Sequence, residues 1–487
     1  LNIAGGFYQS NSLPIANQQC NNWYVNIPQT GGALTQANLY GCAGIAEVLN
    51  TGKLNQINRG SHVKAGKPYF VNGLDLYRLD RVVAIDGVET FSTVKLGEIP
   101  GNNRVSMADN GKELIIVSNG QGWVVDEESD PVFQEITASG FTANGNPQYV
   151  EFINSFFVCT TDSKKYIRSG ANQGLVWNAL NFGAAEADPD NIVAPIVFKN
   201  QLFLGGSETF EVFEFTGASG FGFQRINGLI INKGLFAPAS LVKTADTFMF
   251  IGGGVNESPA IWALAGSTVQ KVSTTAIDNV LQDFLAEDIE KAFAYSYSQN
   301  GAFFVGFTVG DKTFEFNTIT NLWNERSSQI VNTKGRSEVV RWRANSVCSA
   351  YNKLLCGDSQ EGFIGAIDED VYTEYGRNIL RTVTTTPLAD QNNVLTVSQL
   401  ELTVESGVGD FTTTDPVIRM SKSRNGKTFD NELPRSIGKI GEYSKRLIWR
   451  RIGRASRFMV FKFEMSEPVK PVIISLQGQI KGYQIGS

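Results

Sequence analysis

A two-strand pattern recurs along the first three quarters of the sequence and restricts the fold more than any other feature. Each copy has an apolar or aromatic run, a turn rich in Gly, Asn or Asp, and a second apolar run. Examples are KELIIVSNGQGWVVD at 112–126 and NQLFLGGSETFEVFEF at 200–215. Each copy is typical of a β-hairpin. The copies recur every 42–55 residues and begin at residues 67, 112, 154, 200, 246, 301 and 352.

This interval indicates a closed array of small β-sheets. A propeller blade of four strands occupies about 40–50 residues. A single blade cannot bury both of its faces, whereas blades packed around an axis bury one another. A β-helix would need a shorter period, and a plain sandwich gives no reason for such regular spacing. We therefore predict a β-propeller of six or seven blades over residues 51–370, preceded by an extended N-terminal segment, residues 1–50.

One stretch of the propeller region follows a helical period instead. Apolar residues recur at helical spacing from Ile277 through Val280, Leu281, Phe284 and Leu285 to Ile289, which predicts one helix inserted at about 276–292. Carboxylates gather mostly on the opposite face. We interpret them as solvated helix charge rather than as the acid pair of a glycosidase. They are Asp283, Glu287, Asp288 and Glu290.

Charge changes sign near residue 370. The whole chain carries −6, but residues 371–487 hold 17 Lys and Arg against 11 Asp and Glu, which leaves −12 for the first 370 residues. Such a shift indicates a domain boundary. Apolar and polar residues alternate in RFMVFKFEM at 457–465, as in a half-buried strand. The predicted fold is therefore all-β, a propeller followed by a C-terminal antiparallel β-sandwich over residues 371–487.

The positive charge of the last domain is concentrated in one ribbon, KRLIWRRIGRASRFMVFKF at 445–463. Basic residues interleaved with an aromatic can bind phosphate backbones and stack bases. If Ile448 and Ile452 face inward, Arg450 and Arg454 share that face in part and need carboxylates, which an acidic neighbouring subunit would supply. We place a contact between subunits first, a DNA-facing surface second and a solvated edge third. The candidate residues are Lys445, Arg446, Trp449, Arg450, Arg451, Arg454 and Arg457.

No constellation of catalytic or metal-binding residues emerges. The sequence has no G-x-x-x-x-G-K-[ST] phosphate loop, no H-E-x-x-H motif and no G-x-S-x-G elbow in a suitable context. The single histidine, His62, is expected in a surface loop, and the five cysteines are expected as free, mostly buried thiols. No apolar run reaches the roughly 20 residues of a membrane span, so stable membrane insertion is not expected. We predict no cofactor, no metal site and no enzymatic activity.

Six stretches, in order along nearly the whole chain, resemble the tail accessory proteins of short-tailed bacteriophages, also called packaged-DNA stabilisation, hub or nozzle proteins. The last stretch is the most distinctive. They are GGFYQSNSLPIANQQCNNWYVN at 5–26, NRVSMADNGKELIIVSNGQGWVVD at 103–126, SETFEVFEFTGAS at 207–219, INKGLFAPASLVKT at 231–244, MSKSRNGKTFDNE at 420–432 and GKIGEYSKRLIWRRIGRASRFMVFKFEM at 438–465.

This resemblance implies a structural virion protein of the tail, assembled in the cytoplasm of the bacterial host. Relatives form a ring of six copies below the portal and adaptor rings. The ring extends the DNA channel, retains the packaged genome and carries the tail needle or plug and the tailspikes or fibres. The implied partners are these proteins, further copies of the chain and the passing double-stranded DNA. The family offers no catalytic residues to transfer.

Two other functions fit a propeller. The first alternative to a virion protein is a glycan-binding or sialidase-like propeller, because exposed tryptophans stack on sugars. Trp123, Trp177, Trp262 and Trp323 would be the platforms, although the same residues could fill spaces between blades. The third possibility is a scaffold propeller of host type.

Overall fold

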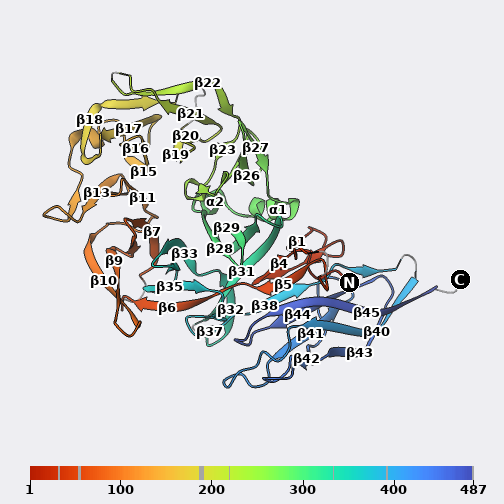
Figure 1. The fold of residues 1–487 in the computed structure, drawn as a ribbon. Coiled ribbons are helices and arrows are strands. Elements are labelled where there is room, and N and C mark those ends of the chain that lie inside the picture. Colours follow the sequence, from red (N-terminus) through yellow and green to blue (C-terminus); the bar gives the residue numbers. More distant parts are fainter. Residues whose placement is uncertain are drawn as a thin grey trace.

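Seven antiparallel sheets surround a common axis, and a β-sandwich lies at one side of the resulting disc (Figure 1). The computed structural model describes residues 1–30, 33–52, 56–185, 191–218, 220–332, 334–390 and 393–484. Among these residues, no helix is long and apolar enough to cross a membrane.

The first four sheets, or blades, follow one another along the chain with four strands each. Blade 1 has β7 (Asn58–Lys64), β8 (Lys67–Asn72), β9 (Asp75–Val83) and β10 (Glu89–Glu98), and blade 2 has β11 (Ser106–Asp109), β12 (Glu113–Ser118), β13 (Gln121–Asp126) and β14 (Phe133–Glu135). Blade 3 has β15 (Pro147–Ile153), β16 (Phe156–Thr161), β17 (Lys165–Gly170) and β18 (Gln173–Ala184), and blade 4 has β19 (Ile192–Phe198), β20 (Gln201–Gly206), β21 (Phe210–Phe215) and β22 (Phe223–Ile231).

The last three blades are less regular. In blade 5 the innermost strand is split, so that β23 (Gly234–Leu235) and β24 (Val242–Lys243) both pair with β25 (Phe248–Gly253), which is followed by β26 (Ala260–Ala265) and β27 (Thr268–Lys271). Blade 6 has β28 (Phe293–Gln299), β29 (Ala302–Val309), β30 (Lys312–Asn317) and β31 (Leu322–Val331). Blade 7 has β33 (Ala344–Ala350), β34 (Lys353–Asp358) and β35 (Phe363–Asp368), and its fourth strand is β6 (Gly44–Asn50) from the start of the chain.

The hairpins predicted from the repeat are confirmed as the two middle strands of the blades. In β12 and β13, for example, every residue after the first is buried. Each middle strand lies between the faces of two neighbouring blades, which explains its continuous apolar run. The outer strand β10 has no buried residue.

The core of the propeller is divided into layers between blades. One layer joins Val71 and Leu76 of blade 1 to Ile116 and Trp123 of blade 2. The layer between blades 7 and 1 closes the circle and includes Phe70 and Leu355. The strand pairing of β6 with β35, from Gly44 opposite Asp368 to Asn50 opposite Phe363, also closes the circle. The N-terminal strand therefore closes the propeller through both hydrogen bonds and packing.

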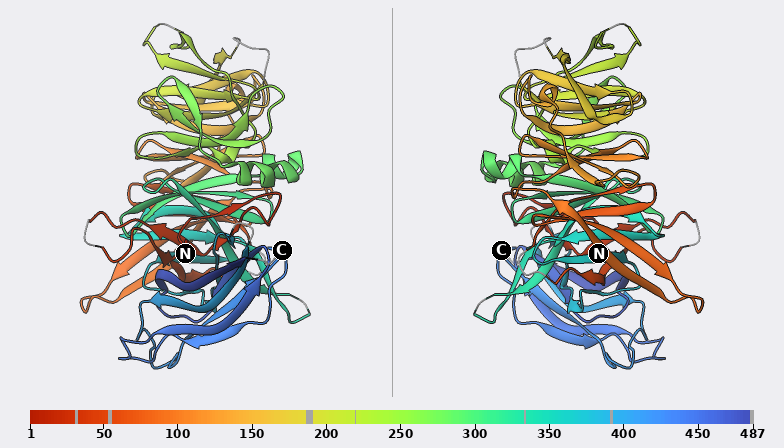
Figure 2. Two further views of the ribbon diagram at one scale, coloured as in Figure 1. Left: turned by 90° about the vertical axis from the view of Figure 1, so that its right-hand side faces the viewer. Right: turned by 90° about the vertical axis from the view of Figure 1, so that its left-hand side faces the viewer.

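The helical segment is two short helices rather than the single helix that the spacing predicts. Helix α1 spans Thr275–Asp283 and α2 spans Ala286–Glu290. Phe284 and Leu285 between them adopt extended backbone, with ψ of 149° and 152°. This break turns Leu285 out of the apolar stripe, and its side chain is 71% exposed. Side views show the helices projecting from one face of the propeller (Figure 2).

The sandwich is built from two sheets, and one of them is continuous with blade 6. The short strand β3 (Cys20–Asn21) pairs with β31 of blade 6 on one side and with β38 (Arg381–Thr384) on the other. That sheet continues through β44 (Phe458–Met465) and β41 (Val417–Ser423) to β42 (Leu433–Ser436). The second sheet has the order β4 (Trp23–Asn26), β5 (Asn38–Gly41), β45 (Val472–Gln484), β40 (Asn393–Val404) and β43 (Leu447–Ala455).

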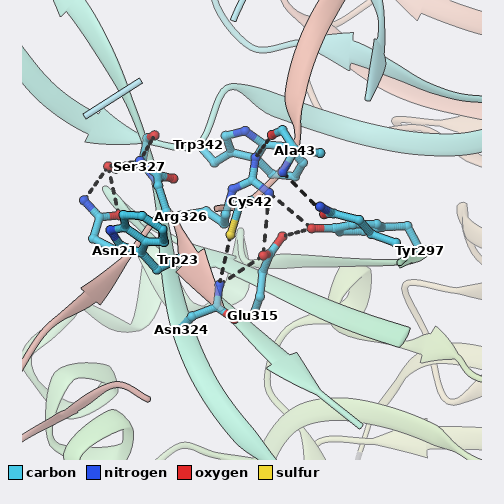
Figure 3. Close-up of polar contacts among 12 residues, drawn as sticks. Asn21, Trp23, Cys42, Ala43, Tyr297, Glu315, Asn324, Arg326, Ser327 and Trp342 are labelled. Atoms are coloured by element: carbon cyan, nitrogen blue, oxygen red, sulfur yellow. Dashed lines mark hydrogen bonds and ion pairs between the residues drawn. The ribbon is translucent and has the colours of Figure 1, made fainter. Parts of the chain in front are cut away.

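A buried polar network fixes the N-terminal segment against blade 6 (Figure 3). Arg326 donates from Nη2 to the Ala43 carbonyl at 3.0 Å and from Nη1 to the Tyr297 hydroxyl at 3.2 Å. The Tyr297 hydroxyl donates in turn to Glu315 at 2.8 Å, and Arg326 lies 3.8 Å from the same carboxylate. The Arg326 guanidinium also stacks on Trp342. Because these groups are buried and mutually bonded, the start of the chain is part of the joint between the two domains.

The five cysteines are all free, as predicted; Cys348 is half-buried and the other four are buried. Burial raises the pKa of the Cys42 thiol to about 12. A thiol of this kind remains protonated and unreactive at neutral pH.

Candidate interaction surface

The basic ribbon forms an edge strand of the sandwich. Among the described residues, β43 pairs only with β40, at the outer border of the molecule in Figure 1. Leu447, Trp449, Ile452 and Ala455 are buried and pack in the core, so the apolar residues of the ribbon account for its strand.

A β-bulge adds Arg451 to the arginines that face outward. The pairing of β43 with β40 shifts between Val397 and Gln399, and Arg451 adopts a positive φ of 58°. The bulge interrupts strict alternation, so Arg450 and Arg451 are both exposed, and Arg454 is exposed as well. The prediction that Arg450 and Arg454 share an inward face is therefore wrong.

Trp449 lies inside the sandwich, and its side chain stabilises the fold. It is 1% exposed, packs edge-to-face on Phe463 and donates its indole N–H to the Leu433 carbonyl at 2.9 Å. Its place in the ribbon suggested stacking on bases or a subunit contact. Burial removes it from either role in this fold.

Three cations from the facing sheet bind the free edge of β43. Arg435 of β42 donates to the Ile448 carbonyl at 3.0 Å, and Arg424, just after β41, donates to the Arg454 carbonyl at 2.9 Å. Lys422 of β41 donates to the Ile452 carbonyl. Edge carbonyls are templates for unwanted strand pairing, and these side chains cover them. They also bring three further positive charges to the exposed arginines.

We call this surface the cationic edge and define it as Lys422, Arg424, Arg435, Arg450, Arg451 and Arg454. Asp430, which lies 3.8 Å from Lys422 and 3.6 Å from Arg424, is its one ion-pair partner within the described ranges. Arg450, Arg451 and Arg454 form no ion pair with any described residue, nor does Arg457, exposed in the turn that follows β43. The surface therefore carries a large uncompensated positive charge.

The first two residues of the ribbon are neutralised within the chain. Arg446 makes two hydrogen bonds to Glu401, at 2.7 and 2.6 Å, and Lys445 lies 3.3 Å from Glu442. The bond from Arg446 lowers the pKa of Glu401. These two cations are less available to a partner than the arginines of the cationic edge.

A second polar region follows the propeller axis, where the inner strands surround a cavity of about 660 Å³. His62 lines it from β7, with Nε2 2.7 Å from Oδ2 of Asp109, and Lys243 lies 2.9 Å from Glu151. The predicted surface-loop position of His62 is wrong, because β7 is the innermost strand of blade 1. Asp109 and Glu151 are thus each paired along this cavity, whereas Arg104, also in its wall, donates to the Asn345 carbonyl and stacks on Phe293. No group of three metal-binding side chains occurs in the described part of the chain.

The tryptophans considered as sugar platforms are mostly enclosed. Trp123, Trp177 and Trp323 are 4%, 6% and 2% exposed, and the first two pack in layers between blades. Trp262 is half-buried and donates its N–H to the Gly252 carbonyl at 2.9 Å.

Both domains match models of known protein families. A family model described as the β-propeller of bacteriophage P22 Gp10 matches residues 2–372, and one described as the β-sandwich of the same protein matches residues 381–481. The chain belongs to the P22 Gp10 family. A curated relative, the tail hub protein gp10 of Salmonella phage P22, is 21% identical over 382 residues, which cover 76% of this chain and 79% of the relative. The protein is accordingly a structural protein of a short-tailed phage tail, located in the virion tail.

Solved propellers resemble the chain only coarsely. The WD40 β-propeller domain of Doa1 is 10% identical and gives a TM-score of 0.38, covering 67% of this chain and 97% of that domain. The computationally designed Ika8 protein is 11% identical with a TM-score of 0.37, covering 66% and 99%. Likeness at this level has no bearing on function.

Proposed function

We propose that copies of this Gp10-family protein form a ring, of six copies as the resemblance implies, below the portal and adaptor of the phage. The observation that carries the proposal is the match of both domains, in order, to the P22 Gp10 models. Such a ring would extend the DNA channel, retain packaged DNA and carry the needle or plug and the tailspikes or fibres. Assembly would take place in the host cytoplasm. The relation to a structural hub protein supports a non-enzymatic role.

The continuity of the two domains suits a ring that bears load. Blade 6 and one sandwich sheet share the strand β3, and the Arg326 network is buried at the same joint. A joint of this kind resists hinge motion, because bending would break strand pairs and buried hydrogen bonds together. Copies that are rigid across both domains can keep the diameter of a channel constant.

Retention of DNA is proposed to come from closing the tube rather than from gripping phosphates. The first 370 residues carry −12, and an acidic wall repels the phosphate backbone and lets the genome slide. We expect the isolated protein to bind duplex DNA weakly. Tight binding that weakens steeply with salt would contradict this mechanism.

Virions assembled without the protein test the function as a whole. We expect heads that have packaged DNA to lose it, and electron micrographs to lack the ring below the adaptor. Supplying the wild-type protein in trans should restore both. If complete tails form and retain DNA without the protein, the proposed function is wrong.

A further inference from the structure

We propose that the cationic edge of one copy docks on the acidic helix pair of a second copy. The acidic helix pair is α1 and α2, with the carboxylates of Asp283, Glu287, Asp288 and Glu290. This inference rests on the proposed ring and names the two surfaces through which neighbouring copies meet.

The cationic edge is prepared for a charged partner. Its three capping side chains are already oriented by bonds to carbonyl oxygens of β43, and among the described residues they share a single ion-pair partner, Asp430. Because these side chains are held in place, less conformational entropy is lost on binding. Arginine guanidinium groups such as those of Arg450 and Arg454 pair with carboxylates through two parallel hydrogen bonds. Trp449, the aromatic residue of the ribbon, is enclosed and offers no platform for bases.

The acidic helix pair offers matching carboxylates. Asp283, Glu287 and Glu290 are exposed and Asp288 is half-buried, and none of the four pairs with a cation among the described residues. Asp278 does not belong to the set, because it is bound to Lys271 at 2.8 Å. Four unpaired carboxylates within eight residues repel one another and would be stabilised by a cationic partner.

An apolar cavity beside the carboxylates can accommodate the methylene groups of arginine side chains from the second copy. The cavity holds about 550 Å³ between the helices and blades 4 and 5, and Phe236, Phe284 and Ile289 are among its walls. Glu290 lies at the same cavity. Arginine side chains cover apolar surface with their methylene groups while the guanidinium meets a carboxylate at the rim.

The two surfaces lie apart on the molecule. The helices project from a propeller face, whereas β43 lies at the outer border of the sandwich (Figures 1 and 2). Because the domains are joined by a continuous sheet, one copy cannot fold its own edge onto its own helices. A contact between unlike surfaces of identical copies repeats from copy to copy and closes into a ring when the rotation permits.

Charge reversal on each side tests the contact. Variant R450E/R451E/R454E alters the edge, and variant D283K/E287K/D288K/E290K alters the helix pair. At about 0.1 M salt, where the Debye length is about 10 Å, we expect wild-type protein to sediment as oligomers and each variant alone as a monomer. An equimolar mixture of the two variants retains one intact edge and one intact helix pair. It should associate into complexes that contain both variants, through the intact edge and helix pair and also through attraction between the reversed charges of the two altered surfaces.

Controls separate the contact from general effects of charge. K199E/K312E/K334E makes the same change in charge at exposed propeller positions and should self-associate like wild type. The milder R450A/R451A/R454A should weaken association about 100-fold with an unchanged thermal midpoint, which excludes misfolding. Raising salt to about 1 M should dissociate the wild-type oligomer.

Several outcomes would overturn the inference. They are a wild-type monomer at about 0.1 M salt, a mixture of variants that stays monomeric, and an edge variant that self-associates normally but loses affinity for a short DNA duplex. The last would assign the edge to nucleic acid. None of these results would affect the proposed function, which is tested separately by virions that lack the protein.

Discussion

Arginines of the propeller and of the sandwich edge serve opposite purposes. In blade 7, Arg343 is buried and makes two hydrogen bonds to Asp358, at 2.8 and 2.7 Å, with both side chains at most 1% exposed. At the sandwich edge, Arg450 is exposed and forms no ion pair with a described residue. The buried charge holds neighbouring elements of one fold together, whereas the exposed charge is left for another molecule. The same residue type therefore predicts stability in one place and association in the other.

Removing Asp358, the partner of the buried Arg343, should have the largest effect on the free energy of unfolding. Asp358→Ala leaves the Arg343 guanidinium uncompensated in the interior, and it also removes the acceptor of the Glu361 N–H at 2.8 Å. We expect a loss of about 3–5 kcal/mol in the free energy of unfolding, measured by urea denaturation. Asp86→Ala in an exposed turn is the control. A loss below about 1 kcal/mol would show that the pair does not hold the blade.

Truncation of Trp449 tests the core side of the same edge strand. Trp449→Ala should cost about 3 kcal/mol, because it opens a cavity against Phe463 and leaves the Leu433 carbonyl without its donor. Affinity for DNA should not change at conditions where the variant is folded. If the variant were fully stable but bound DNA less well, Trp449 would have a surface role after all.

A carboxyl group at the joint of the domains should have an intermediate effect on the free energy of unfolding, and this effect should depend on pH. Burial raises the pKa of Glu325 on β31 to about 7. The folded state keeps this proton to about pH 7, whereas the unfolded chain loses it near pH 4.3. Stability from this group is therefore present at low pH and is lost as pH rises from about 4.3 through 7. Glu325→Gln should flatten that decline, as measured by urea denaturation at pH 5 and 8. An unchanged pH profile would contradict the assignment; exposed Glu338→Gln is the control.

The smallest effect on stability is expected at the cationic edge. Combined replacement of Arg450, Arg451 and Arg454 by Ala should change the free energy of unfolding by about 0.5 kcal/mol or less, because these side chains are exposed and unpaired. Calorimetry of the monomeric variant measures this. A loss of several kcal/mol would erase the contrast with Arg343.

Local repetition made the architecture predictable from sequence. Each middle hairpin of a blade is continuous in sequence and centred on apolar residues, so its signal does not depend on distant residues. The closing strand β6 gave no such signal. Its partner β35 lies more than 300 residues away, and pairing at that distance leaves no periodic trace.

The candidate surface was predictable only in part. The density of arginine marked the right strand, but the expected parity was wrong, because Leu447, Trp449 and Ala455 face inward and leave Arg450 and Arg454 exposed. Simple alternation also cannot anticipate the positive φ of Arg451, which turns a third arginine outward. Gly453, with φ of 119°, was the available hint of irregularity. The capping cations Lys422 and Arg424 were missed because they reach β43 from the opposite sheet. Their alternation in SKSRNGK was the signal that could have suggested a shared face.

Pairing between the two ends of the chain has a consequence for synthesis. β6 can pair with β35 only after blade 7 has been translated. β5 can pair with β45, at residues 472–484, only after almost everything else has been translated. A nascent copy on the ribosome therefore has an open circle and an unfinished sandwich. Products truncated before β35 lack a closed disc, and products truncated before β45 lack the strand that lies between β5 and β40 in the second sandwich sheet.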